Sequence, residues 1–278
     1  FYDMKHPKLY YGHWQPGKDH PVLGSQIRKL ANRNYLAENF VEDASPCGMV
    51  KAVHVQAAIG SADPVDETEW LQEVYSRTEF PQAIVGHVDL RKSDAEEQIE
   101  RHMKFRNFKG IRDFSYGDYL VNDDFKRGFS LLSKYGLISS VCVTWQDMIK
   151  LAELAGIYSD TTIVIDHAGM PLERTQDYFK QWRDGMSMLA GQDNIICKIS
   201  GLGIGDYNWT IETIRPYVET CIDLFGCDRS LFATNWPIDS LWSSYGDVIN
   251  AYRKLTQSLT FTEQDAMFAG NAERIYQI

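Results

Sequence analysis

The sequence lacks an apolar run of the roughly 20 residues that a helix needs to cross a bilayer. It also lacks a positively charged leader followed by an apolar stretch at its start. These absences predict a soluble, cytoplasmic protein with no membrane partner. Positive charge is scarce too, because 28 lysines and arginines stand against 38 aspartates and glutamates, for a net charge of -10. Such a chain repels a polyphosphate backbone, so we expect no nucleic-acid partner.

Cysteine is rare, and no two cysteines form a Cys-x-x-Cys pair. The chain has five: Cys47, Cys142, Cys197, Cys221 and Cys227. Their odd number, scattered spacing and mostly apolar neighbours predict reduced thiols in the core and argue against a disulfide framework. A cysteine-based zinc site is not indicated either.

Short apolar or β-branched runs recur along the chain, each followed by a longer segment of helical period. The seven runs are Met49–Gln56, Ala83–Leu90, Phe108–Phe114, Leu137–Val143, Thr162–His167, Asn194–Ser200 and Ser230–Thr234. Consecutive runs start 25 to 36 residues apart, which is the length of one strand plus one crossover helix. The pattern predicts βα units and a parallel sheet.

Several intervening segments have the apolar spacing of an amphipathic helix. Helices are expected over Asp94–Phe105, Asp123–Tyr135, Ile211–Leu224 and Val248–Leu259, and another over Ser25–Asn39. Gly136 is a candidate C-cap for the second of these helices.

The length of 278 residues suits an α/β fold, a (β/α)₈ TIM barrel of roughly 250 residues, formed as one domain over residues 1–278. Seven strands do not close an eight-stranded barrel, and an open sheet would expose a long unpaired edge. The first 48 residues hold no comparable run, and the chain starts without methionine. We therefore expect strand one to be missing or truncated before Phe1.

Polar residues at the carboxyl ends of the predicted strands are the candidates for chemistry, because sites in this fold form there. His167 follows an apolar run and precedes a Gly-Met-Pro turn, which favours a catalytic role over that of a packed histidine. Arg112 follows another run, and its guanidinium suits a carboxylate or a lactone carbonyl. The alternative for Arg112 is a salt bridge with Asp113 or Asp118.

The last predicted strand leads into Asn235, Trp236, Pro237 and Asp239. The amide of Asn235 could donate to a developing oxyanion. Asp239 is a candidate base, or a group that orients one; the alternative is an N-cap.

Further residues at strand ends are expected to bind substrate. Lys198 and Ser200 share one strand parity, so they can line the cavity together. The expected substrate-binding set is Arg112, Trp145, Gln146, Lys198, Ser200, Trp236, Gln56 and His87. For His54 and His87, packing inside the barrel is the favoured alternative.

Eight segments in order resemble the amidohydrolase superfamily, in the branch of TIM-barrel amidohydrolases that includes sugar lactonases and 2-pyrone-4,6-dicarboxylate lactonase. They are HVQAA, ETEWL, VGHVDL, FKGIRDF, DHAGMP, KISGL, NWPID and FAGNAERIY. The resemblance runs through nearly the whole chain and implies a hydrolase. In that family a His-x-His pair on strand one precedes an aromatic and an acidic residue similar to Phe1, Tyr2 and Asp3, so this sequence would begin just after the pair.

The resemblance also implies roles for three positions. His167 corresponds to the family's strand-six histidine, Arg112 to its strand-four arginine, and position 235 to its strand-eight aspartate. Asn235 departs from that pattern, because an amide neither binds a divalent metal strongly nor takes a proton from water. We therefore expect no metal ligand and no cofactor, and Zn²⁺ stays open only if an upstream His-x-His exists.

The leading hypothesis is a lactonase-like hydrolase that opens a lactone or similar cyclic ester of a small carboxylated or sugar-derived substrate by water attack. Arg112 and His167 would polarise the carbonyl, Asn235 would assist, and Asp239 would activate water. The alternatives are a metal-dependent decarboxylase of an aromatic or enoic acid, and a non-catalytic barrel that binds a small carboxylate. The expected partner is a small-molecule substrate, and a homo-oligomer stays open.

Overall fold

The computed structural model describes residues 1–31, 33–113 and 117–278, and its centre is one sheet of seven parallel strands in sequence order. The strands are β1 (Val53–Val55), β2 (Ala83–Gly86), β3 (Phe108–Ile111), β4 (Ile138–Val141), β5 (Ile163–Ile165), β6 (Ile195–Ile199) and β7 (Ser230–Phe232). Each predicted run contains one of these strands, so the parallel βα pattern is confirmed. Phe114, the end of the third run, lies outside the described residues.

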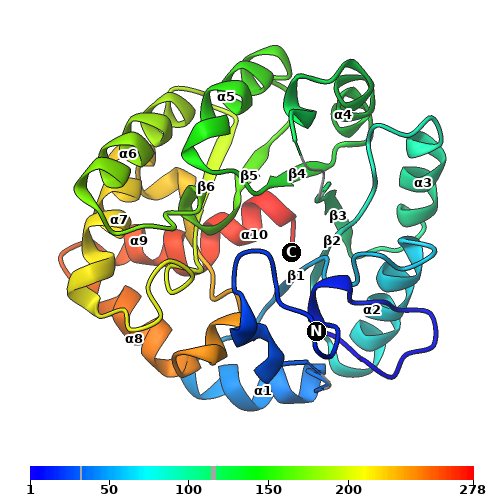
Figure 1. Cartoon of the computed structure of the whole chain (residues 1–278), viewed down its shortest axis with the longest axis horizontal. Coiled ribbons are helices and arrows are strands. Elements are labelled where there is room, and N and C mark those ends of the chain that lie inside the picture. The colour runs from blue at the N-terminus through cyan, green and yellow to red at the C-terminus, as the bar shows by residue number, and fades with distance from the viewer. Residues whose placement is uncertain (32, 114–116) are drawn as a thin grey trace.

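Helices alternate with the strands and surround the curled sheet (Figure 1), which gives the chain a TIM-barrel-like α/β fold. They are α2 (Val65–Thr78), α3 (Ala95–His102), α4 (Asp123–Tyr135), α5 (Met148–Ile157), α6 (Gln176–Ala190), α7 (Ile211–Phe225) and α8 (Tyr245–Leu255). The helices predicted in these regions are confirmed with small shifts at their ends. Gly136 caps α4 in the left-handed conformation, with φ of 64°, as predicted.

The helix predicted over Ser25–Asn39 is wrong. A 3₁₀ helix covers Ser25–Lys29, and α1 covers only Ala37–Ala44. Between them Tyr35 forms an antiparallel bridge with Tyr2, with N–H···O distances of 2.8 Å in both directions. Because this pairing requires extended backbone at Tyr35, a long-range contact overrides the local helical pattern.

The sheet curls without closing in the described part of the chain, because β1 pairs only with β2 and β7 only with β6. The eighth strand expected upstream of Phe1 stays a prediction.

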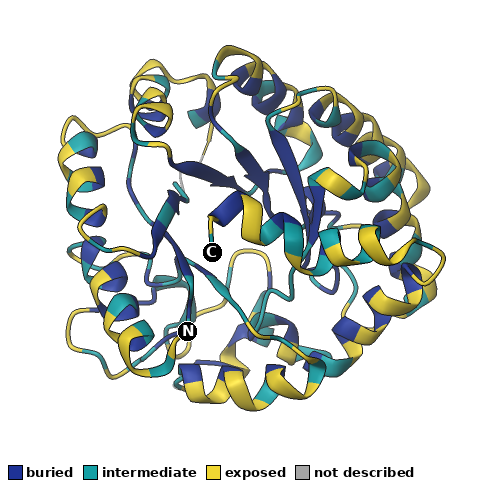
Figure 2. Ribbon diagram, turned by 180° about the vertical axis from the view of Figure 1, so that it is seen from behind, coloured by how far each residue is buried: buried dark blue, intermediate teal, exposed yellow. Residues whose placement is uncertain are grey.

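Two apolar layers hold the fold together. Inside the curled sheet, Val85, Val164 and Ile196 pack with Ile275 and Tyr276 of α10 (Asn271–Tyr276), the helix that follows α9 (Phe261–Asp265). Figure 2 shows α10 across the centre of the sheet, and it also shows most of the strands as buried and the outer faces of the helices as exposed.

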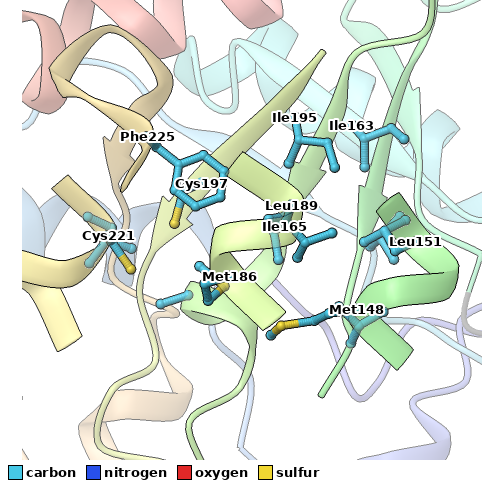
Figure 3. Packing of buried hydrophobic residues seen from close by; sticks show 14 of the residues in the cluster. Met148, Leu151, Ile163, Ile165, Met186, Leu189, Ile195, Cys197, Cys221 and Phe225 are labelled. Atoms are coloured by element: carbon cyan, nitrogen blue, oxygen red, sulfur yellow. The ribbon is translucent and has the colours of Figure 1, made fainter. Parts of the chain in front are cut away.

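The second layer lies between the strands and the surrounding helices (Figure 3), where Met148 of α5 and Met186 of α6 pack with Ile165 of β5. All five cysteines are free; Cys197 and Cys221 are buried in the core, as predicted, whereas Cys47, Cys142 and Cys227 are half-buried. No helix within the described ranges is long and apolar enough to cross a membrane.

Candidate active site

A cavity of about 960 Å³ opens at the carboxyl ends of the strands and continues between β1 and β7. Seven of the predicted site residues line it: Gln56, Arg112, His167, Lys198, Ser200, Asn235 and Trp236. The parity expected for Lys198 and Ser200 is confirmed, since both face this cavity. Residues from five different strand ends therefore meet around one space.

The buried carboxylate of Asp166, directly after β5, organises the cationic side of the cavity. Its Oδ2 lies 3.1 Å from Arg112 Nη1, and its Oδ1 lies 2.5 Å from Lys198 Nζ. The hydroxyl of Ser140 donates to Oδ1 at 2.7 Å. Burial alone would raise the pKa of Asp166, but the charges of Lys198 and Arg112 hold it well below its usual range.

The two cations are fixed in place by the same contacts. The second amino group of Arg112, Nη2, donates to the backbone oxygen of Gln56 at 2.7 Å. Burial would lower the pKa of Lys198, but the Asp166 carboxylate outweighs it and raises that pKa, so the ammonium stays charged. Arg112 thus forms a salt bridge with Asp166, whereas the alternative predicted from the sequence was a salt bridge with Asp113 or Asp118.

His167 lies on a tight turn after β5, with φ of 52° in the left-handed region. The turn is supported by Trp182, whose Nε1–H donates to the oxygen of Ala168 at 2.8 Å. His167 Nδ1 lies 2.9 Å from Ser200 Oγ, which fixes the ring in the cavity wall. Burial lowers the pKa of His167 to about 4, so the imidazole is neutral near pH 7.

Asn235 and Asp239 form a pair after β7. Asn235 lines the cavity, and its Nδ2 donates to Asp239 Oδ1 at 3.0 Å. Asp239 is not among the residues lining this cavity: it is 2% exposed and lies beside a separate small pocket with Trp209 and Tyr252. Burial raises the pKa of Asp239 to about 8. The geometry therefore sets Asp239 behind Asn235, away from the water that it was expected to activate.

Three other predicted substrate-binding residues lie outside the cavity wall: His87, Trp145 and Gln146. His87 Nδ1 bonds to the backbone oxygen of Arg112 at 3.1 Å, which fits its alternative packing role. His54 is buried and 3.3 Å from Glu67, yet it does line the cavity. The sequence pattern could not separate these cases, because the curl of the sheet decides which strand-end side chains face inward.

An N-terminal loop, residues 11–24, contributes cavity residues, of which sequence reasoning missed the two histidines. His13, Trp14 and His20 all line the cavity, although they belong to no strand. In Figure 1 this segment, in dark blue, lies beside β1. The only signal in the sequence was an unusual density of aromatic and histidine residues before the first strand.

The side chains of the cavity decide whether it can support thiol or metal chemistry. Burial raises the pKa of Cys142, which lines the cavity, to about 12, so its thiol stays protonated. Over the described ranges, no three His, Cys, Asp or Glu side chains gather closely enough to hold a metal ion. Arg112 and Lys198, which are cations, and Asn235, a neutral amide, line the same cavity as His167, so these described side chains do not by themselves form a divalent-metal site.

Comparison with known proteins supplies a family. The sequence profile of the family described as Amidohydrolase matches residues 14–278. The protein y4mH of Sinorhizobium fredii is 38% identical over 259 residues, covering 89% of this chain and 87% of that protein. L-fucono-1,5-lactonase of Burkholderia ambifaria is 29% identical over 253 residues, with coverage of 85% and 84%.

Solved structures of amidohydrolases have a similar fold. An amidohydrolase of Burkholderia multivorans with bound HEPES superposes with a TM-score of 0.85 at 26% identity, over 96% of each chain, and another crystal form of it contains bound Zn. A 2,6-dihydroxybenzoate decarboxylase from Rhizobium, with a TM-score of 0.64 at 14% identity over 92% of this chain and 93% of that one, shares the fold alone. The chain belongs to the amidohydrolase family.

Proposed function

We propose that this protein is a hydrolase that opens a small sugar-derived lactone by water attack. The observation that carries the proposal is the meeting of a neutral imidazole, His167, with two fixed cations, Arg112 and Lys198, in one cavity. The similarity to L-fucono-1,5-lactonase supports a lactone as substrate. We also propose that residues 1–278 form a single domain, since all seven strands belong to one sheet.

His167 is the general base in this proposal. Nδ1 lies 2.9 Å from Ser200 Oγ, and in the proposed tautomer Nδ1–H donates to that oxygen, which leaves Nε2 with a lone pair for the proton of water. Asp239, which sequence reasoning made the base, lies behind Asn235 and has no cavity surface for that task. A positioned base of this kind contributes about 10²- to 10⁴-fold to the rate.

Water attack on the lactone carbonyl carbon breaks its π bond and places negative charge on the carbonyl oxygen. Arg112 and Lys198 stabilise that charge, because both are held by Asp166 and need no reorganisation. When the negative oxygen forms the carbonyl double bond again, the bond from the carbonyl carbon to the ring oxygen breaks. His167 gives the proton to the ring oxygen, and the product is an open hydroxy acid.

Asn235 orients the attacking water. Because its Nδ2 donates to Asp239, its Oδ1 is the end of the amide left to accept a hydrogen bond from water. This differs from the oxyanion donor expected from the sequence, since one of the two amide hydrogens is already engaged by Asp239.

The charge of the cavity wall favours an uncharged substrate over a dicarboxylate. At the strand ends the two cations, Arg112 and Lys198, are matched by two acids that also line or bound the cavity, Asp113 and Asp166. The buried His167 adds no charge near pH 7. At the strand ends no net positive charge is then left for two carboxylates, whereas a neutral sugar lactone needs none. Lys51, Arg253 and Glu273 also line the cavity, but they come from the segment before β1, from α8 and from α10.

The test is His167→Asn, assayed by proton release on a panel of sugar 1,5-lactones and 2-pyrone-4,6-dicarboxylate. We expect the variant to lose about 10²-fold or more in kcat/KM on the lactone that the wild type hydrolyses. The control is His102→Asn, because His102 is a fully buried histidine that bonds to Thr68 and to the backbone of His87 and does not line the cavity. Undiminished turnover by His167→Asn would overturn the proposal.

The two alternatives have their own outcomes in the same experiment. Release of CO₂ from aromatic or enoic acids, with no lactone hydrolysed, would identify a decarboxylase. Saturable binding of a small carboxylate without any turnover would identify a binding protein.

A further inference from the structure

The N-terminal loop, residues 11–24, brings hydrogen-bonding groups to the cavity that the proposed hydrolysis does not use. We propose that His20 and Trp14 of this loop, with Gln56 at the end of β1, form a subsite that binds the hydroxyl groups of an uncharged polyhydroxylated substrate. This inference rests on the proposed function, because it names the part of the substrate that lies away from the scissile ester.

His20 is a hydrogen-bond donor of fixed direction. Its Nδ1 accepts from the backbone N–H groups of Val22 at 3.0 Å and Leu23 at 3.1 Å. A ring nitrogen that accepts two hydrogen bonds carries no proton, so the proton of the neutral ring lies on Nε2. Burial, followed by the neighbouring His13, lowers the pKa of His20 to about 4, which keeps the ring neutral. The Nε2–H makes no hydrogen bond within the described residues, and His20 lines the cavity.

The loop holds this donor in place at both ends. The backbone groups of His20 and Gly24 exchange hydrogen bonds at 3.1 and 2.9 Å, and Gly24 turns the chain with φ of 56°. At the start of the loop, the N–H of Gly12 donates to the oxygen of Ile59 at 2.9 Å. Donors fixed in this way bind a ligand with little loss of conformational entropy.

Trp14 and Gln56 add a donor and an acceptor that the protein leaves unpaired. The indole nitrogen of Trp14 is buried without a partner in the described part of the chain, and its ring stacks on Tyr2 at a centroid distance of 5.0 Å. Gln56 is 1% exposed, and its Oε1 also has no hydrogen-bond partner there. A buried polar atom without a partner is costly unless a ligand or water satisfies it, and both residues line the cavity.

The chemistry of this set matches hydroxyl groups better than ionic groups. Two neutral N–H donors and one amide oxygen can each bond to a sugar hydroxyl, which both donates and accepts. A carboxylate would be repelled by the Gln56 oxygen, and an ammonium group by the two donors.

The experiment measures binding by titration calorimetry with two probes that resist hydrolysis: an aldono-1,5-lactam, which carries ring hydroxyls, and δ-valerolactam, which has none. The wild type should bind the hydroxylated lactam at least about tenfold more tightly, the effect of one or two good hydrogen bonds. Two variants of His20 separate its two nitrogens. His20→Gln keeps a donor near Nε2 and loses the acceptor of the loop, whereas His20→Asn keeps an acceptor near Nδ1 and loses the donor.

We expect His20→Gln to retain the preference for the hydroxylated lactam and His20→Asn to lose most of it, with δ-valerolactam bound equally by both. The opposite order would show that His20 only anchors the loop, and would overturn the subsite. The ¹⁵N signal of wild-type His20 Nε2 provides a second readout, which should shift with the hydroxylated lactam and not with δ-valerolactam.

The outcomes also distinguish this inference from the proposed function. Lactone hydrolysis by a protein that shows no preference between the lactams would refute the subsite and leave the hydrolase. A clear preference for the hydroxylated lactam in a protein that hydrolyses no lactone would support the subsite and refute the hydrolase. A wild type that binds neither lactam and hydrolyses no lactone would overturn both.

Discussion

Replacing Asp166 by Asn should destabilise the protein strongly, because this side chain separates two buried cations. Asp166 is fully buried, while the side chains of Arg112 and Lys198 are 15% and 8% exposed. An asparagine keeps the shape and can still accept from Ser140, but it removes the carboxylate charge that pairs with both cations. Breaking a buried ion pair by removing one partner costs about 3–5 kcal/mol, a large part of a typical folding free energy of about 5–15 kcal/mol.

Asp184→Asn is the matched control. Asp184 pairs with Lys180 at 2.6 Å on the surface of α6, with side chains 59% and 76% exposed. An exposed pair of this spacing is worth about 0.3–0.5 kcal/mol, so the same substitution should be almost silent there. Urea unfolding at pH 7 measures both variants. If Asp166→Asn lowers the free energy of unfolding by no more than Asp184→Asn does, Asp166 is not needed to compensate the charges of Arg112 and Lys198.

The pH dependence of the Asp166 effect has a defined sign. The pKa of Asp166 is depressed in the folded protein, so its stabilisation is complete above the unfolded pKa of about 3.9 and is lost only as pH falls through the folded pKa. The difference between wild type and Asp166→Asn should therefore be the same at pH 6 and pH 8. A difference that changes across this interval would mean that another group titrates with the pair.

Three further predictions address the site. Gly201→Ala would place a Cβ 2.8 Å from His167 Nδ1 and should lower kcat/KM by about 10- to 100-fold. The control is Gly136→Ala, which has a similar backbone strain, with φ of 64° against 61°, but open space around the new Cβ, so it should leave kcat/KM unchanged. Equal kcat/KM values for the two variants would contradict this prediction. The pKa of Asp239 is raised to about 8, so wild-type stability should fall from about pH 4 to pH 8. In urea unfolding, Asp239→Asn should therefore raise the free energy of unfolding more at pH 8 than at pH 5. An equal effect at both pH values would contradict the raised pKa of Asp239. Chelator treatment should leave lactone hydrolysis unchanged, because the residues present do not fit a divalent metal; loss of rate restored by Zn²⁺ would reverse that conclusion.

Sequence periodicity predicted the strands and helices around the barrel because they are local and repetitive. All seven apolar runs contain strands, and the same regularity placed Arg112, His167 and Asn235 at strand ends that meet around one cavity. Alternation along β6 also predicted that Lys198 and Ser200 share a face. These features follow from the strand period of two residues and from the common direction of parallel strands.

The features that sequence analysis missed depend on turns and long-range contacts. Asp239 lies behind Asn235 because the chain turns at Asn235 with φ of 51°, a conformation that no apolar pattern encodes. His20 reaches the cavity through a loop closed by its bridge with Gly24. The helix predicted at Ser25–Asn39 failed because of the pairing of Tyr35 with Tyr2. For His20 and Tyr35 the deciding contact is a backbone bridge, and for Asp239 it is the turn at Asn235; the apolar pattern of the sequence specifies none of them.

The central claim is that a buried, neutral His167 takes the proton from the attacking water. The pH profile of kcat/KM for the wild-type enzyme on its lactone tests this most directly, because that profile reports ionisations of the free enzyme. Since burial lowers the pKa of His167 to about 4, kcat/KM should stay level from about pH 6 to pH 8 and fall only as the pH approaches 4. An inflection near pH 6.5, or a rate that rises steadily with hydroxide concentration across this range, would contradict it.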